Sequence, residues 1–338
     1  MKKLLLSGLL GLITLANASA ADSPLLITGE GATFPAPIYK KWFSDYNKVA
    51  PNVQISYTAD GSGAGKKAIG VDMSVDFGAS DGPMTDAEVA SAKGGKILHL
   101  PTVAGAVVMT YNLEGNPQIK LDGDTIAKIY LGTIKKWNDL AIIDQNPGIK
   151  LPDQYIAVIH RADGSGTSFI FTDFLSSVNK DWSDKVGKNT AVNWPVGLGG
   201  QGNDGVTAMV KQLPGSIGYV ELIYALQNNM KYADIKNSAG KYITASLDSV
   251  KEAMATAKIP DDFRFSMVNP PGDKSYPIAG CTWLLVYQNQ KDPAKGKALV
   301  DFLKWAYKSG MDDATGLKYA ALPSALVDRV LKVVDTIK

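Results

Sequence analysis

Apolar and polar positions follow two alternating periods along the chain. Segments with a period of two residues, typical of strands, are separated by segments with a period near 3.6, typical of helices. The strand-like segments are a stretch from Ile27 that ends in the glycine-rich turn 29–31, then 53–57, 75–79, 97–100, 106–111, 156–159 and 282–287. This alternation predicts an α/β fold in which helices cover the sheets. We expect 97–100 and 106–111 to be separate segments, divided by Pro101 and Thr102.

Several helices are indicated by their ends as well as by their period. The first has Pro35 and Pro37 at its start, where prolines fit because the N–H groups of a first turn have no intrahelical partner. Another has Asp292 as its predicted N-cap and Pro293 at its first position, and the last helix starts near Ser324. Their regular spacing, without a long linker or low-complexity segment, is typical of a compact globular chain.

The first twenty residues have the pattern of a secretion signal. Lys2 and Lys3 precede an apolar run over 4–15, and 18–20 reads Ala-Ser-Ala, a typical cleavage site. The apolar run is too short for a membrane-spanning helix, which needs about 20 apolar residues. We therefore predict that 1–20 is a signal peptide and that the remaining chain is exported as a soluble protein.

Charge and composition argue against several classes of function. The chain of 338 residues has 35 Lys and Arg against 33 Asp and Glu, whereas nucleic-acid-binding proteins usually have a basic excess. The single cysteine, Cys281, lies among apolar and small residues, which favours a buried side chain over a reactive thiol. His99 and His160 are the only histidines and belong to no cluster with metal-ligand spacing. We expect no metal and no cofactor.

Three predicted helix starts are suited to an anion. Glycine, serine and threonine precede helices at 32–34, 61–63 and 165–167, and Asp-Gly-Ser-Gly occurs at both 60–63 and 163–166. Unpaired N–H groups at a helix start carry partial positive charge, and hydroxyls add further donors. The same spacing also fits ordinary strand-to-helix turns. We expect the helix after the loop at 61–63 to run from Lys66 onward. No Walker motif is present, which disfavours a nucleotide triphosphatase.

Two side-chain groups strengthen the anion hypothesis. Arg161 immediately precedes the third loop, and its planar guanidinium matches two oxygens of a tetrahedral oxyanion. Asp163, two residues later, could hold the guanidinium in place, although an exposed ion pair explains the same spacing. Asp81 would repel an anion unless it accepts a hydrogen bond from a protonated oxygen of that anion, which phosphate has near neutral pH and sulfate does not. Asp81 also fits an ordinary turn, since 80–83 reads Ser-Asp-Gly-Pro.

Together these segments resemble the PstS family, the periplasmic phosphate-binding proteins of the high-affinity phosphate ABC transporter. The resemblance covers essentially the whole chain after residue 20. The matching motifs lie at 28–37 (TGEGATFPAP), 76–81 (DFGASD), 129–137 (IYLGTIKKW), 161–169 (RADGSGTSF), 197–205 (GLGGQGNDG), 215–221 (GSIGYVE) and 319–323 (YAALP).

The resemblance implies a two-lobed α/β fold of the type II periplasmic binding protein kind. Each lobe would be a mixed sheet flanked by helices, with the ligand in the cleft between them. We expect lobe I at 21–101 plus 276–338 and lobe II at 102–275. The hinge would lie near 102–103 and 277–278.

The resemblance also implies a ligand set. The expected phosphate-binding residues are Thr33, Phe34, Ser62, Asp81, Arg161, Asp163, Ser165, Gly166 and Thr167. Two positions depart from the family pattern: 61–65 reads Gly-Ser-Gly-Ala-Gly where Gly-Ser-Ser-Gly-Gly is frequent, and His160 stands where a second arginine is common.

By this resemblance the protein is expected to bind inorganic phosphate and deliver it to the permease subunits of an ABC importer, acting as a monomer. Two alternatives remain open. One is a receptor for another tetrahedral oxyanion. The other is a secreted phosphatase-like enzyme with Ser62, Ser165 or Thr167 as nucleophile, which we disfavour because neither histidine lies in a matched motif that would make it the base.

Overall fold

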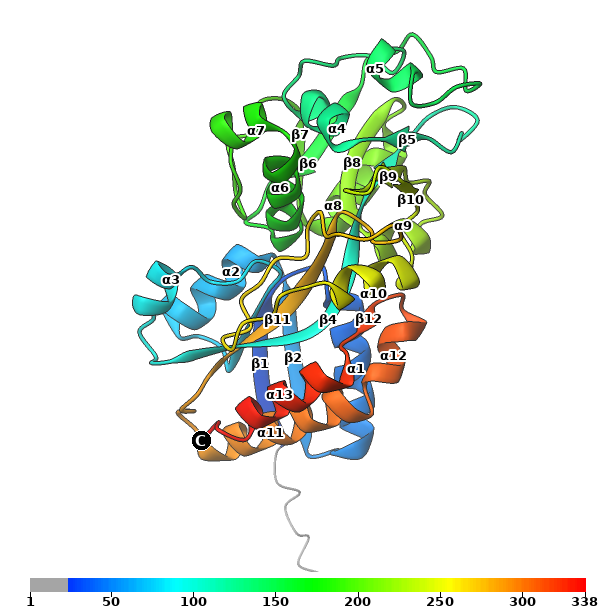
Figure 1. Cartoon of the computed structure of the whole chain (residues 1–338). Coiled ribbons are helices and arrows are strands. Elements are labelled where there is room, and N and C mark those ends of the chain that lie inside the picture. Colours follow the sequence, from blue (N-terminus) through cyan, green and yellow to red (C-terminus); the bar gives the residue numbers. More distant parts are fainter. Residues whose placement is uncertain (1–23) are drawn as a thin grey trace, which may run out of the picture.

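The computed structural model describes residues 24–338, in which the chain forms two α/β lobes (Figure 1). The predicted signal peptide, 1–20, lies outside the described residues. The two-lobed α/β fold expected from the sequence is confirmed. No helix among residues 24–338 combines the length and the apolar character needed to cross a bilayer.

Lobe I contains both ends of the described chain. Its sheet has the order β2-β1-β3-β11-β4, with β12 paired to the other side of β4. The first three strands are parallel, and β11 runs antiparallel to both β3 and β4, so the sheet is mixed. The strands are β1 (Leu25–Gly31), β2 (Val53–Ala59), β3 (Phe77–Ser80), β4 (Ile97–Tyr111), β11 (Ala279–Tyr287) and β12 (Ala320–Ala321). The helices are α1 (Ala36–Val49), α2 (Ser62–Lys67) with the π-helical turn η1 (Ala68–Asp72), α3 (Asp86–Ala90), α11 (Pro293–Lys308), α12 (Met311–Gly316) and α13 (Ser324–Val334).

Lobe II continues the same sheet in the order β4-β8-β6-β7, in which β8 is antiparallel to β4 and the others run parallel. A small sheet, β10-β9-β5, lies at its edge. The strands are β5 (Lys120–Leu121), β6 (Ala157–Arg161), β7 (Leu198–Gly200), β8 (Ser216–Glu221), β9 (Asp234–Lys236) and β10 (Tyr242–Ile243). The helices are α4 (Gly123–Tyr130), α5 (Leu140–Ile143), α6 (Gly166–Val178), α7 (Lys180–Lys185), α8 (Gly202–Gln212) and α9 (Leu222–Gln227), and α10 (Leu247–Ala255) packs back against β4, β11 and β12.

The strand β4 joins the lobes and corrects one prediction. It is continuous from Ile97 to Tyr111, whereas we expected a break at Pro101 and Thr102. A β-bulge accommodates these residues, because Val103 pairs with Thr282 while Pro101 pairs with the next residue of β11. Its part before residue 107 pairs with β11 in lobe I, and its part from 107 onward pairs with β8 in lobe II.

Helix starts agree with the sequence except in one case. Asp292 caps α11 by accepting hydrogen bonds from the N–H groups of Ala294 and Lys295, as predicted. The predicted start of α13 at Ser324 is also confirmed. By contrast, α2 starts at Ser62, not at Lys66, because Gly61 adopts a φ of 118° that ends the preceding loop.

The segment returning from α10 to β11 contacts lobe I. The guanidinium of Arg329 donates to the carbonyls of Ile259 and Pro260, and the indole of Trp283 donates to the carbonyl of Phe263. These contacts attach part of the returning segment to lobe I. The boundary at 275/276 and the hinge positions stay predictions.

Candidate ligand-binding site

The three glycine-rich loops meet where the two lobes touch. Gly63 of lobe I donates its N–H to the carbonyl of Gly164 in lobe II, at 2.7 Å. A Cβ atom on Gly166 would lie 2.4 Å from Ser62 Oγ and 2.5 Å from Asp81 Oδ2, so only glycine permits this approach. The lobes are therefore closed on each other at this site.

All nine residues predicted to form the site lie in or beside these loops. Thr33 and Phe34 lie between β1 and α1, Ser62 begins α2, and Asp81 follows β3. From lobe II, Arg161 ends β6, and the segment 163–167 leads into α6. Eight of the nine are buried, and the ninth, Asp163, has a side chain that is 8% exposed.

Backbone donors at the site have no protein partner. In the described part of the chain, no hydrogen bond is donated by the N–H groups of Thr33, Phe34, Ser62, Gly166 or Thr167. Buried N–H groups are nearly always paired, and leaving one unpaired costs roughly 1–3 kcal/mol. A buried group of donors from both lobes is therefore suited to an acceptor-rich ligand.

The arginine at the site, Arg161, is fixed by an aspartate. Arg161 Nε donates to Asp163 Oδ1 at 2.8 Å, and its Nη2 is paired with the other carboxylate oxygen. Asp163 Oδ1 also accepts the N–H of Gly202 at 3.0 Å, and Arg161 Nη1 donates to Thr167 Oγ1 at 3.3 Å. The guanidinium side chain is only 1% exposed, which excludes the exposed ion pair considered from the sequence.

Asp81 is a buried acid whose carboxylate oxygens have no hydrogen bond of normal geometry. It is 2% exposed, and burial raises its pKa to about 7, although the hydroxyls of Thr282 and Ser62 and the charge of Arg161 act in the opposite direction. An ordinary turn aspartate would be solvated or would cap its own turn. Asp81 does neither, so its oxygens are available to accept a hydrogen bond from a protonated ligand.

Asn203, at the start of α8, was missed by the sequence reasoning. Its side chain is fully buried, and Nδ2 donates to Thr33 Oγ1 at 2.8 Å and to Thr167 Oγ1 at 3.1 Å. Oδ1 accepts the N–H of Glu221 at 2.9 Å. Asn203 thus links the two lobes. The motif at 197–205 contained the signal, an asparagine at a glycine-rich helix start, but spacing did not reveal its partners.

The remaining candidate groups are separate from the site. His160 stacks on Trp194 with ring centroids 4.9 Å apart, and His99 Nε2 accepts the N–H of Met84 at 3.0 Å. Cys281 is buried, as predicted. Among residues 24–338 there is no group of three or more His, Cys, Asp or Glu side chains placed to hold a metal ion.

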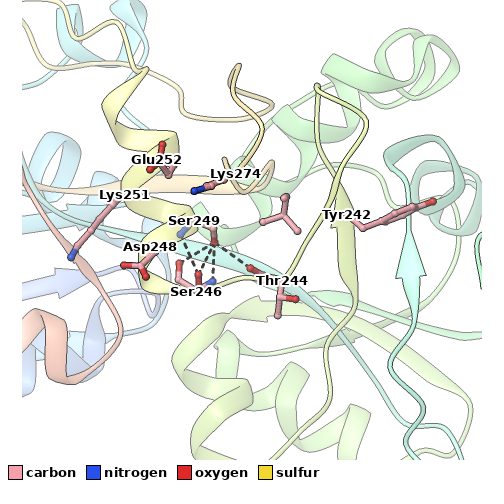
Figure 2. A pocket seen from close by; sticks show the side chains of 9 residues that line it. Tyr242, Thr244, Ser246, Asp248, Ser249, Lys251, Glu252 and Lys274 are labelled. Atoms are coloured by element: carbon pink, nitrogen blue, oxygen red, sulfur yellow. Dashed lines mark hydrogen bonds between the residues drawn. The ribbon is translucent and has the colours of Figure 1, made fainter.

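An open hollow of about 540 Å³ between β10 and α10 has a different character (Figure 2). The hydroxyls that line it bond to one another and to the local backbone. Ser249 Oγ, for example, donates to the carbonyls of Thr244 and Ser246 in the turn before α10. The hollow is open to solvent and its serine hydroxyls already bond to local groups, so the buried interlobe site is the better candidate.

Two α/β lobes that enclose a buried, donor-rich site define the class of substrate-binding proteins. A family model described as the PBP superfamily domain matches residues 18–309. The phosphate-binding protein PstS of Xylella fastidiosa (strain 9a5c) is 42% identical over 308 residues, covering 90% of this chain and 83% of the relative. PstS of Pasteurella multocida (strain Pm70) is 41% identical, covering 90% of this chain and 88% of its own. Among solved structures, the phosphate-binding protein from Stenotrophomonas maltophilia superposes with a TM-score of 0.72 at 25% identity, covering 91% of this chain and 93% of that chain. The chain belongs to the PstS family of phosphate-binding proteins.

Proposed function

We propose that the protein binds inorganic phosphate between its lobes and delivers it to the membrane subunits of an ABC phosphate importer. The observation that carries the proposal is the buried combination of unpaired N–H donors, the Arg161 guanidinium and the unpartnered Asp81 carboxylate. Donors and guanidinium suit the phosphate oxygens, and the ionised carboxylate suits the proton that phosphate retains near neutral pH.

Each predicted ligand has a definite role in this proposal. Thr33, Phe34, Ser62, Gly166 and Thr167 offer backbone N–H groups, the last aided by the first turn of α6. The hydroxyls of Thr33, Ser62 and Thr167 add side-chain donors or acceptors. Ser165 is the N-cap of α6, where its Oγ accepts the N–H of Ser168 at 3.0 Å, and so sets the direction of that turn.

Asp163 fixes the orientation of the Arg161 guanidinium and leaves other guanidinium N–H groups able to donate to a ligand. Arg161 Nη1 contacts only Thr167 Oγ1 among the described residues, at 3.3 Å, and retains capacity for a ligand oxygen. Phosphate would therefore bridge the lobes, and its binding would favour the closed form by contributing bonds that the open form lacks.

We further propose that binding occurs without chemical turnover. A phosphatase would need a base within hydrogen-bonding reach of a nucleophile. In the described part of the chain, no hydrogen bond joins a histidine to Ser62, Ser165 or Thr167, and the Ser62 hydroxyl instead accepts the N–H of Asp81 at 3.1 Å. Relatives named as binding proteins support the same interpretation. Periplasmic location, monomeric state and docking on a permease form part of this proposal.

The test is a calorimetric titration of the mature protein with phosphate and with sulfate at pH 8. We expect phosphate to bind and excess sulfate not to compete. Asp81→Asn should reduce this discrimination, because a neutral amide no longer repels sulfate, whereas the matched control Asp76→Asn, outside the site, should retain it. Equal binding of both anions by the wild type, or unchanged selectivity in Asp81→Asn, would contradict the assignment. Release of product from a chromogenic phosphate ester would instead support the phosphatase alternative.

A further inference from the structure

The loop that carries Thr33 and Phe34 is held by three tyrosines. Three consecutive carbonyls each accept a hydrogen bond from a different tyrosine hydroxyl. Tyr57 bonds to Ala32 at 2.7 Å, Tyr224 bonds to Thr33 at 2.5 Å, and Tyr319 bonds to Phe34 at 2.6 Å. The three tyrosines come from distant parts of the chain, namely β2, α9 and the residue before β12.

Peptide geometry connects these carbonyls to the site. The described chain has no cis peptide bond, and in a planar trans peptide the N–H points opposite to the C=O of the same unit. Holding the carbonyl of Ala32 therefore fixes the direction of the Thr33 N–H. Holding the carbonyl of Thr33 likewise fixes the Phe34 N–H. The carbonyl of Phe34 precedes a proline, which has no N–H, so its bond anchors the end of the loop.

The three hydroxyls remain neutral donors. Burial raises the pKa of Tyr57 and Tyr319 well above the ordinary value, and it also raises the pKa of Tyr224. The negative charge of Asp81 acts in the same direction on all three. Each hydroxyl therefore keeps its proton at any pH at which phosphate transport takes place, and the orientation of the loop does not titrate.

One of the three bonds crosses between the lobes. Tyr57 and Tyr319 belong to lobe I, like the loop itself, and hold it whether or not the lobes are closed. Tyr224 lies on α9, directly after β8 of lobe II, and reaches the carbonyl of Thr33 from the opposite side of the cleft. Asn203 of lobe II reaches the Thr33 hydroxyl in the same region. Closure of the lobes therefore adds the hydrogen bond that fixes the peptide unit carrying the Phe34 N–H.

We propose that Tyr57, Tyr224 and Tyr319 are positioning residues that aim the Thr33 and Phe34 N–H groups at the ligand, with Tyr224 acting only in the closed form. This inference rests on the proposed phosphate-binding function. It assigns the tyrosines no contact with phosphate itself. Their effect is exerted through the peptide planes, and it strengthens binding because the donors do not have to be ordered when the ligand arrives.

The experiment compares phosphate affinities of the single variants Tyr57→Phe, Tyr224→Phe and Tyr319→Phe with the wild type. Each removes one oxygen and keeps the ring. The matched control is Tyr307→Phe, because the buried Tyr307 hydroxyl also donates to a backbone carbonyl, that of Pro101 at 2.8 Å, away from the site. We expect each of the three variants to bind phosphate about tenfold more weakly, and the control to stay within about twofold of wild type. Tyr224→Phe should act mainly by faster phosphate dissociation.

A spectroscopic measurement separates positioning from a general loss of stability. In ¹H–¹⁵N spectra, phosphate should shift the amide protons of Thr33 and Phe34 downfield in the wild type. Tyr57→Phe should diminish the shift of Thr33, and Tyr224→Phe that of Phe34, while Tyr307→Phe leaves both unchanged. Weaker binding with both shifts intact, or affinities equal to wild type, would overturn the inference and leave phosphate binding standing. A wild type that does not bind phosphate would refute the proposed function and this inference with it.

Discussion

Replacing Asp81 by asparagine should stabilise the ligand-free protein at alkaline pH, even though it impairs the proposed site. Burial raises the pKa of this carboxyl from 3.8 to about 7, although the nearby hydroxyls of Thr282 and Ser62 and the charge of Arg161 act in the opposite direction. The ionised side chain therefore destabilises the folded state. Asparagine has nearly the same shape and no charge, so it removes that cost.

The magnitude follows from the pKa shift. A change of about three pKa units, at 1.36 kcal/mol per unit, corresponds to about 4 kcal/mol. Because the folded state binds the Asp81 proton more tightly than the unfolded state does, the free energy of unfolding of the wild type decreases as the pH rises from about 4 to about 7. Above that range this contribution is constant. The stability of Asp81→Asn relative to wild type should therefore increase by about 4 kcal/mol between pH 4 and pH 8.

Urea denaturation followed by circular dichroism, in phosphate-free buffer at several pH values, measures this difference directly. Other buried acids, such as Glu221, are present in both proteins and largely cancel in the comparison. Excess phosphate provides an internal control, since ligand binding stabilises the wild type by mass action. It should reduce or reverse the stability difference between the wild type and Asp81→Asn. A stability difference that stays the same from pH 4 to pH 8 would refute the claim that Asp81 is a buried, uncompensated acid.

Three further predictions concern other parts of the molecule. Gly166→Ala should abolish phosphate binding and leave the lobes apart in small-angle X-ray scattering, because its Cβ would lie 2.4 Å from Ser62 Oγ; unchanged affinity would show that the lobes do not need this approach. Asp163→Asn should weaken phosphate binding by tenfold or more in calorimetry, at about 1.4 kcal/mol per tenfold, because an amide holds the Arg161 guanidinium less firmly. Cys281 should react with a thiol reagent only after unfolding, since burial raises its pKa above the ordinary value, and rapid reaction of the native protein would contradict this.

Local features of the site could be predicted from the sequence because they depend on neighbouring residues. Arg161 and Asp163 are two residues apart at the end of β6, and the structure joins them as expected. Asp292 and Ser324 were identified as helix starts from local chemistry alone. The neighbours of Asp81 allow two interpretations, a turn residue or a ligand, because Ser-Asp-Gly-Pro suits a turn, and its burial separates them.

Features that depend on distant partners were not predicted. The break expected in β4 is absent because β11, about 180 residues later, pairs on both sides of the bulge at Thr102. Asn203 and Thr33 are 170 residues apart, and Tyr319 and Phe34 are 285 residues apart. No periodicity or motif spacing in the sequence indicates these long-range pairings. They arise only when the chain folds, and the contact of Asn203 with Thr33 also needs the two lobes to meet.

The charges of the site explain why an overall neutral chain can be suited to an anion. Arg161 is already paired with Asp163, and an ionised Asp81 would make the formal charge of this group negative. Attraction to a dianion must therefore come mainly from oriented dipoles, namely the N–H groups at the loops and the first turn of α6. Dipoles act only at short range and in a fixed direction, whereas net charge attracts any anion. Selectivity in such a site consequently depends on how firmly the peptide planes are held, which is the role assigned here to Tyr57, Tyr224 and Tyr319.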